Sequence, residues 1–243
     1  MKKRIIVTTS WDDGHKLDKR VAQLLKKYNI KGTFYVSPQE REFPKSDLLT
    51  DSDIKALSKD FEIGAHTMTH PHLSRISMNE AEKEISESKI YLEKITGKKI
   101  TAFCYPYGSY NKNVVKLVKK NNFLLARTVT EYSTNLTSDK FTVPTTIECH
   151  RISLPNLIKE MHALFVLSNK NIVETIKFLN WEYLAKYLFD YCVKNGGVYH
   201  LWGHSWVLEK WNEWEKFERV LAYISEHKDI EFVTNSELTK MKI

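Results

Sequence analysis

The order of short apolar runs and amphipathic runs constrains the fold of this chain more than any other feature. A strand-like run at residues 4–9 is followed by helical spacing over 18–28 and by a second strand-like run at 33–36. The alternation continues along most of the chain, and it predicts further strands at 61–65, 100–105, 123–128, 198–202 and 230–233. Such alternation implies parallel strands joined by right-handed crossovers.

Helical spacing separates most of these strands. Ser77 and Glu80 fit a capping box at the start of a helix that we expect to end near Thr96, before Gly97. Residues 131–153 carry no clear pattern. The other helices are expected at 51–58, 111–120, 157–167, 181–194 and 214–227.

The pattern favours a TIM-like α/β barrel of seven or eight parallel strands. The chain lacks the glycine-rich signatures of dinucleotide-binding and P-loop folds, which removes those two alternatives. With 42% hydrophobic residues and few Gly or Pro, residues 1–243 are expected to form one catalytic domain. In such barrels the active site is built from polar residues at the carboxyl ends of the strands.

Two adjacent carboxylates follow the first predicted strand. Asp12 and Asp13 come directly before Gly14. Their mutual repulsion costs stability unless a cationic group lies beside them. The alternative is an exposed turn at Gly14 with no chemical role.

Two histidines follow the third predicted strand. His66 and His70 are four residues apart, so one helical turn would bring both imidazoles to the same face. Two imidazoles and one carboxylate form a facial set that leaves coordination positions open for water and substrate. His72 is offset from this pair, which favours a structural or solvent-facing role.

The fourth and seventh strands end in less specific sequences. Tyr105–Gly108 contains a Pro–Gly turn that by itself indicates only aromatic packing. The segment His200–Trp206 adds two histidines and two tryptophans at the same expected face, where indole rings can stack on sugars.

Together these segments resemble the polysaccharide deacetylase family, the carbohydrate esterases with NodB homology. Ser10–Gly14 is similar to the family's T-F-D-D-G motif, and His66–His70 matches H-[ST]-x-x-H. Tyr105–Gly108 matches part of R-x-P-Y-G, and Leu201–His204 is a stretched form of L-x-H. The order of the motifs holds from Thr8 to about Trp206, and the family fold is a distorted (β/α) barrel.

The resemblance implies a metal-dependent hydrolase that removes N-acetyl groups by attack of a metal-activated water molecule. Thr67 would hold the histidine loop. Asp12 would be the general base, His204 the general acid, and the backbone N–H of Tyr107 would bind the oxyanion. A divalent metal, most simply zinc, would be bound by Asp13, His66 and His70.

Three departures from the family pattern leave questions open. The motif arginine that orients the base is replaced by Cys104, whose thiol cannot make a charged, bidentate contact. Arg127 is a candidate replacement and Arg151 a weaker one, against the alternative that Arg127 is a surface residue. The D-x-x-D-W motif is not recognisable between residues 128 and 153, and His200 remains an alternative to His204 as the acid.

An N-acetylated sugar or glycan is therefore the expected partner. Alternatives are hydrolysis of another small amide, imide or ureide, or a sugar-binding protein without activity. The net charge of +7 is spread over predicted helices without a nucleic-acid motif, so no nucleic-acid partner is expected. Three scattered cysteines and no apparent signal or transmembrane segment favour a cytoplasmic protein; the sequence does not fix the oligomeric state.

Overall fold

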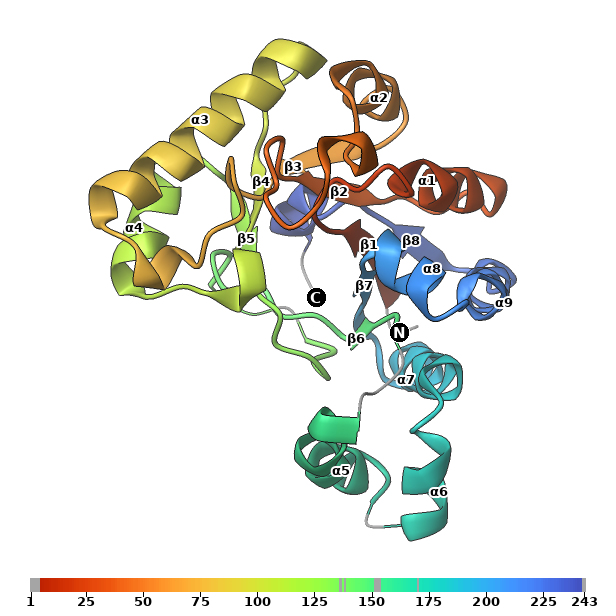
Figure 1. The fold of residues 1–243 in the computed structure, drawn as a ribbon. Helices are drawn as coiled ribbons and strands as arrows, with labels where there is room; N and C mark the ends of the chain where they lie inside the picture. The colour runs from red at the N-terminus through yellow and green to blue at the C-terminus, as the bar shows by residue number, and fades with distance from the viewer. Residues whose placement is uncertain (1–4, 136, 138, 151–153, 170, 242–243) are drawn as a thin grey trace.

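The computed structural model describes residues 5–135, 137, 139–150, 154–169 and 171–241. One curled sheet lies at the centre, and helices surround its outer side (Figure 1). The strand order is β5-β4-β3-β2-β1-β7-β6, with β8 beside the first half of β1. The strands are β1 (Ile5–Trp11), β2 (Thr33–Val36), β3 (Glu62–Ala65), β4 (Ala102–Cys104), β5 (Leu125–Arg127), β6 (Ile147–Glu148), β7 (Gly197–Gly203) and β8 (Ile230–Phe232).

Every pairing between these strands is parallel, so the prediction of a distorted (β/α) barrel is confirmed. Residues 140–149 close the gap between β5 and β7. At one end the Thr128 N–H donates to the Val143 carbonyl oxygen at 2.8 Å. At the other end the Cys149 N–H donates to the Trp202 carbonyl oxygen at 2.7 Å. The stretch without a clear sequence pattern therefore contributes the short strand β6.

The helices follow the predicted ranges closely, and the capping box of Ser77 and Glu80 is present. Gly97 ends that helix with a left-handed backbone at φ 67°. The short helices α6 and α8 were not predicted, since each spans less than two turns. The helices are α1 (Asp18–Lys27), α2 (Asp51–Leu57), α3 (Met78–Thr96), α4 (Lys112–Lys120), α5 (Leu154–Leu167), α6 (Ile172–Lys177), α7 (Trp181–Asn195), α8 (Ser205–Lys210) and α9 (Trp214–Ser225), with 3-10 turns η1 (Lys45–Asp47), η2 (Leu73–Arg75), η3 (Pro106–Gly108) and η4 (Ser236–Lys240).

The hydrophobic core joins the outer face of the sheet to the surrounding helices. Trp11 of β1, for example, is fully buried and packs edge-on against Phe217 of α9, with ring centroids 4.8 Å apart. Helices α5 and α6 extend away from the barrel on the side of α7 (Figure 1). None of the helices in the described ranges is both long and apolar enough to cross a membrane. The cysteines are free and buried.

Candidate active site

Because the strands are parallel, their carboxyl ends meet at one rim of the barrel, and a cavity of about 510 Å³ opens there. Its lining comes from segments that are far apart in the sequence. The lining residues are Asp12, Asp13, Glu42, His66, His70, Tyr107, Val129, Glu131, Glu148, His150, Trp202, His204 and Trp206.

The turn after β1 sends its two carboxylates in different directions. The Asp12 N–H still follows the sheet and donates to the Gly203 carbonyl oxygen at 3.1 Å. Asp13 then takes a left-handed backbone, with φ 78°, and Gly14 follows at φ 74°. At Gly14 a Cβ atom would lie 2.7 Å from Val36 Cγ1, so the position favours glycine on steric grounds as well. This turn leads the two carboxylates to different partners, although the charge of Asp12 still contributes to the raised pKa of Asp13.

Asp13 and the two histidines after β3 converge on one point. Asp13 Oδ1 lies 3.7 Å from His66 Nε2 and 3.4 Å from His70 Nε2. The two Nε2 atoms are 3.1 Å apart. Thr67 shapes the loop between them, because its Oγ1 accepts the His70 N–H at 3.0 Å. The side chains of Asp13, His66 and His70 are buried.

The donor set fits a divalent cation. His66 Nδ1 donates to the Cys104 carbonyl oxygen at 2.8 Å, so the Nε2 lone pair of a neutral ring faces the cavity. Burial and the nearby His70 lower the pKa of His66 to about 3, which keeps that ring neutral. Burial raises the pKa of Asp13, and its Oδ1 accepts no hydrogen bond from the described residues. A bound cation would satisfy these buried groups.

His70 has a second contact that the sequence did not indicate. Its Nδ1 lies 2.8 Å from Glu40 Oε2 and 3.1 Å from the Tyr107 hydroxyl oxygen. Burial disfavours protonation of His70, but the carboxylates of Glu40 and Asp13 outweigh burial and raise its pKa. Glu40 lies in the loop after β2, which carries no motif.

Arg127, the candidate replacement for the motif arginine, lies beside Asp12. Its guanidinium donates to both carboxylate oxygens of Asp12, and both side chains are buried. Burial alone would raise the pKa of Asp12, but Arg127, His66 and His204 together outweigh burial and lower it. Arg127 is the register partner of Cys104 in the β4–β5 pairing. Arg151 lies outside the described residues.

His204 also lies at the cavity, at the start of α8. Its Nδ1 is 3.0 Å from Glu148 Oε1, and its Nε2 is 3.9 Å from Asp13 Oδ2. Burial opposes protonation, but Asp13 and Glu148 outweigh burial and raise the pKa of His204 to about 10. Glu148 belongs to β6, so the sequence, which gave no pattern there, did not identify it.

The alternative acid, His200, occupies a different environment. It pairs with Thr8 in the middle of β7, and its Nε2 lies 2.8 Å from Ser10 Oγ. Burial and Arg127 lower its pKa to about 3, and it is not among the residues that line the cavity. The geometry therefore distinguishes the two histidines and favours His204 for contact with a ligand.

Aromatic side chains form part of the rim. Tyr107 has a left-handed backbone at φ 56°, and its ring stacks on His72 with centroids 4.0 Å apart. This contact agrees with a structural role for His72. The Trp206 Nε1–H donates to Asp13 Oδ2 at 2.8 Å, and Trp202 also lines the cavity.

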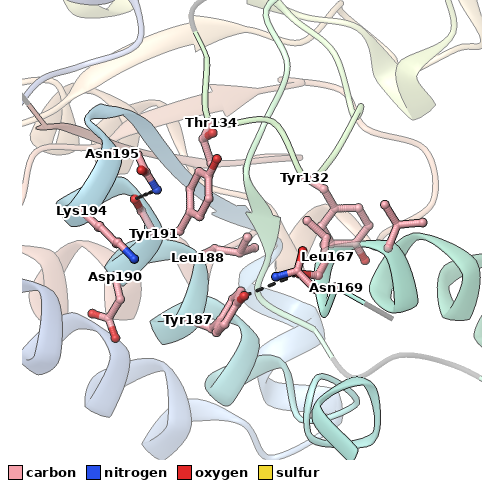
Figure 2. A pocket seen from close by; sticks show the side chains of 11 residues that line it. Tyr132, Thr134, Leu167, Asn169, Tyr187, Leu188, Asp190, Tyr191, Lys194 and Asn195 are labelled. Carbon is pink, nitrogen blue, oxygen red and sulfur yellow. Dashed lines mark hydrogen bonds between the residues drawn. The ribbon is translucent and has the colours of Figure 1, made fainter. Parts of the chain in front are cut away.

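A second cavity, of about 760 Å³, lies apart from these groups (Figure 2). Tyr187 and Tyr191 of α7 line it together with Tyr132 and Thr134. It is larger than the cavity at the strand ends, but it lacks the paired carboxylates and imidazoles found there.

Comparisons with known proteins agree with this geometry. The family model described as polysaccharide deacetylase matches residues 1–126, more than half of the 243 residues. The peptidoglycan-N-acetylmuramic acid deacetylase PdaC of Bacillus subtilis is 30% identical over 116 residues, which are 47% of this chain and 24% of that protein. A peptidoglycan-N-acetylglucosamine deacetylase of Bacillus cereus is 26% identical over 125 residues, 50% of this chain and 43% of that protein. The chain thus spans less than half the length of either relative.

Likeness to solved structures extends over nearly the whole chain. A family 4 acetyl xylan esterase from Clostridium thermocellum, solved in complex with a cobalt ion, superposes with a TM-score of 0.61. The alignment covers 97% of this chain and 90% of that one at 19% identity, so it supports the fold. With the match of the family model, these findings show that the chain belongs to the polysaccharide deacetylase family.

Proposed function

We propose that this chain is a metal-dependent deacetylase that removes N-acetyl groups from an amino sugar in a glycan, with residues 1–243 acting as one catalytic domain. One observation carries the proposal: Asp13 Oδ1 and the Nε2 atoms of His66 and His70 converge beside a buried Asp12–Arg127 pair. Sugar binding alone would not require this combination of a cation site and a separate, oriented carboxylate.

Asp13, His66 and His70 would hold a divalent ion, with zinc the first choice for two imidazoles and one carboxylate. When bound, such an ion supplies Lewis acidity, which polarises the acetyl carbonyl and stabilises negative charge.

Asp12 would act as the general base. Its carboxylate is kept ionised by Arg127 and points into the cavity, so it can take a proton from the water that attacks the carbonyl carbon. Arg127 would fix the orientation of that carboxylate, as the family's motif arginine is expected to do. The replacement is physically reasonable because Cys104 and Arg127 are neighbours across β4 and β5.

His204 would act as the general acid. Once the attack has formed a tetrahedral centre, the C–N bond breaks and the amine nitrogen receives the proton of His204, which leaves acetate and a free amino sugar. Glu148 accepts the Nδ1 proton and so directs the Nε2 proton toward the cavity. The backbone N–H of Tyr107 would help to stabilise the negative oxygen of the tetrahedral centre.

The similarity to two peptidoglycan deacetylases, of Bacillus subtilis and Bacillus cereus, supports a glycan substrate. Trp206 is partly exposed and lines the cavity beside the proposed catalytic groups, where its ring offers a stacking surface for a sugar. Trp202 is buried, with the Arg127 guanidinium 4.5 Å from its ring centroid.

The test is acetate release from chitin oligomers and from peptidoglycan by the zinc-loaded protein, compared with the chelator-treated protein and with Asp12→Asn. The expected result is release that depends on both zinc and Asp12. Asp60→Asn, which alters an exposed ion pair with Lys26, is the matched control. Hydrolysis of cyclic amides without acetate release from any glycan would replace the proposed substrate class, and full activity of Asp12→Asn would remove Asp12 from the mechanism.

A further inference from the structure

The loop that follows β2 is hydrogen-bonded to the loop that carries the two histidines. The Ser37 hydroxyl donates to the His66 carbonyl oxygen, and the Gln39 N–H donates to the Met68 carbonyl oxygen at 2.9 Å. These contacts lie on both sides of Thr67, in the middle of the turn. The backbone of one loop therefore fixes the position of the other, and the side chain of Glu40 is held at a fixed distance from His70.

Glu40 is a buried carboxylate with few ways to be satisfied. Its side chain is only 1% exposed, and its Oε1 accepts the Glu42 N–H at 2.8 Å. Its Oε2 accepts no hydrogen bond from the described residues and lies 2.8 Å from His70 Nδ1, an ion-pair contact. Burying a carboxylate is costly unless it is paired, so this contact with His70 accounts for its presence inside the protein.

The other neighbour of His70 Nδ1 is also an acceptor. The Tyr107 hydroxyl donates its proton to Glu42 Oε1, so its oxygen presents a lone pair to Nδ1 at 3.1 Å. With a carboxylate on one side and this oxygen on the other, Nδ1 must carry a proton. The Nε2 of a neutral His70 ring then presents its lone pair toward Asp13 Oδ1.

Both histidines are thus expected in the tautomer with a proton on Nδ1, but the groups that face Nδ1 differ. His66 donates Nδ1–H to a neutral backbone carbonyl, that of Cys104, whereas His70 Nδ1 lies in ion-pair contact with a carboxylate and is hydrogen-bonded to the Tyr107 hydroxyl oxygen. A carboxylate partner makes an imidazole a stronger ligand than a carbonyl does, because it stabilises the positive charge that develops on the ring.

We propose that Glu40 is a positioning residue that sets the tautomer of His70 and strengthens its Nε2 as a metal ligand. This inference rests on the metal site of the proposed function. It concerns metal affinity and makes no assumption about which substrate is hydrolysed.

The test measures zinc affinity of the full chain by competition with a chromogenic chelator, for wild type, Glu40→Ala and Glu40→Gln. Loss of such a carboxylate partner typically weakens metal affinity by about 10–100-fold, which is the expected result for Glu40→Ala. In Glu40→Gln an amide oxygen can still face the Nδ1 proton, so a smaller loss than in Glu40→Ala is expected. In Glu40→Gln, nitrogen NMR of the His70 ring is expected to show that Nδ1 still carries the proton.

Glu87→Gln is the matched control, because Glu87 is exposed, pairs with Lys83 on α3 and does not line the cavity. Its zinc affinity is expected to stay within about threefold of wild type, as for the loss of an exposed, solvent-screened charge. The thermal midpoint of each metal-free variant is measured beside its affinity, to separate positioning from folding.

Three outcomes would overturn the proposal. Wild-type zinc affinity in Glu40→Ala, with or without a lower thermal midpoint, would make Glu40 purely structural. Binding of two zinc ions by wild type and one by Glu40→Ala would make Glu40 a ligand itself, in the cluster of Glu40, Glu42 and His70. No zinc binding by wild type would remove the metal site altogether. A protein that binds zinc through this arrangement but releases no acetate would instead refute the proposed function and leave the role of Glu40 intact.

Discussion

The candidate site is assembled from two parts of the barrel that are built differently. From β1 to β4 the chain contributes Asp12, Asp13 and the loop His66–His70, in which functional side chains are neighbours or four residues apart. That loop is not the helical turn expected from the spacing, because Thr67 and His70 have left-handed backbones. From β5 onward it contributes Arg127, Glu148 and His204, each on a separate element. The first part brings like groups together where we propose that a cation binds, and the second pairs single charged residues with partners across the barrel. On that proposal the cation site is encoded in two short segments, whereas proton transfer would depend on closure of the ring.

The family comparison has the same division. The matched region ends at residue 126, and Arg127 is the next residue. Arg127 and His204 therefore lie in the part of the chain that the family match does not cover, although they adjoin Asp12 and Asp13. If the two parts have the roles proposed here, substitutions in them should affect different measurements.

The largest effect is expected at Asp12, where the two parts meet. Asp12→Asn removes the proposed base while keeping its volume, and loss of a general base typically lowers the rate by about 10²–10⁴-fold. Zinc affinity should change little, because Asp12 is not in the proposed ligand set. Acetate release and metal content of the same preparation measure both quantities. An equal fall in metal content and activity would assign Asp12 to the metal site.

Arg127→Ala should be the most destabilising single change in the second part. It leaves Asp12 buried without its partner, and breaking a buried ion pair costs about 3–5 kcal/mol of unfolding free energy. Urea denaturation measures the loss. Arg219→Ala is the control: Arg219 also contacts both oxygens of a carboxylate, that of Glu182, but it is 51% exposed, so its loss should cost less than about 1 kcal/mol.

A double variant tests whether the arginine has moved between strands. Cys104→Arg with Arg127→Cys exchanges two register partners, so the guanidinium would approach Asp12 from β4 instead of β5. Partial recovery of stability and activity relative to Arg127→Ala is expected. A double variant no better than Arg127→Ala would show that only β5 provides the required geometry.

Metal removal should separate the two parts of the site. Zinc at about 100 times its dissociation constant is expected to stabilise the folded protein by about 2.7 kcal/mol, which a chelator would remove. The stabilisation should be lost in His66→Ala and kept in His204→Ala, because only His66 belongs to the proposed ligand set. Thermal unfolding with and without zinc measures it. Loss of the zinc effect in His204→Ala would place a ligand in the second part.

The smallest effect is expected for Glu148→Gln, and it should depend on pH. Asp13 and Glu148 raise the pKa of His204 against the effect of burial, so the protonated acid persists above its usual range and activity falls as pH rises through that pKa. Without the charge of Glu148 the pKa is lower, and the alkaline limb should move to lower pH. One pKa unit corresponds to a tenfold change in protonation, so a loss of about tenfold is expected on that limb. An unchanged profile of acetate release against pH would separate Glu148 from the acid.

The sequence by itself determined the order of the strands along the chain, except for β6, and the end of the barrel at which the polar groups gather. It also singled out the Asp12–Asp13 pair, His66 and His70, because alternation of apolar residues, turn residues and a four-residue spacing are all local signals. The choice of Asp13 over Asp12 as a metal ligand came from the family resemblance. Even the capping box that opens α3 could be identified from Ser77 and Glu80 alone.

Only the tertiary structure decided which distant residues are partners. Arg127 reaches Asp12 because β5 pairs with β4 in one particular register, and Glu148 reaches His204 because β6 pairs with β7. Glu40 lies against His70 because two loops are joined by hydrogen bonds. Register and loop packing arise from contacts between residues that are many positions apart, and no periodicity within one segment contains that information.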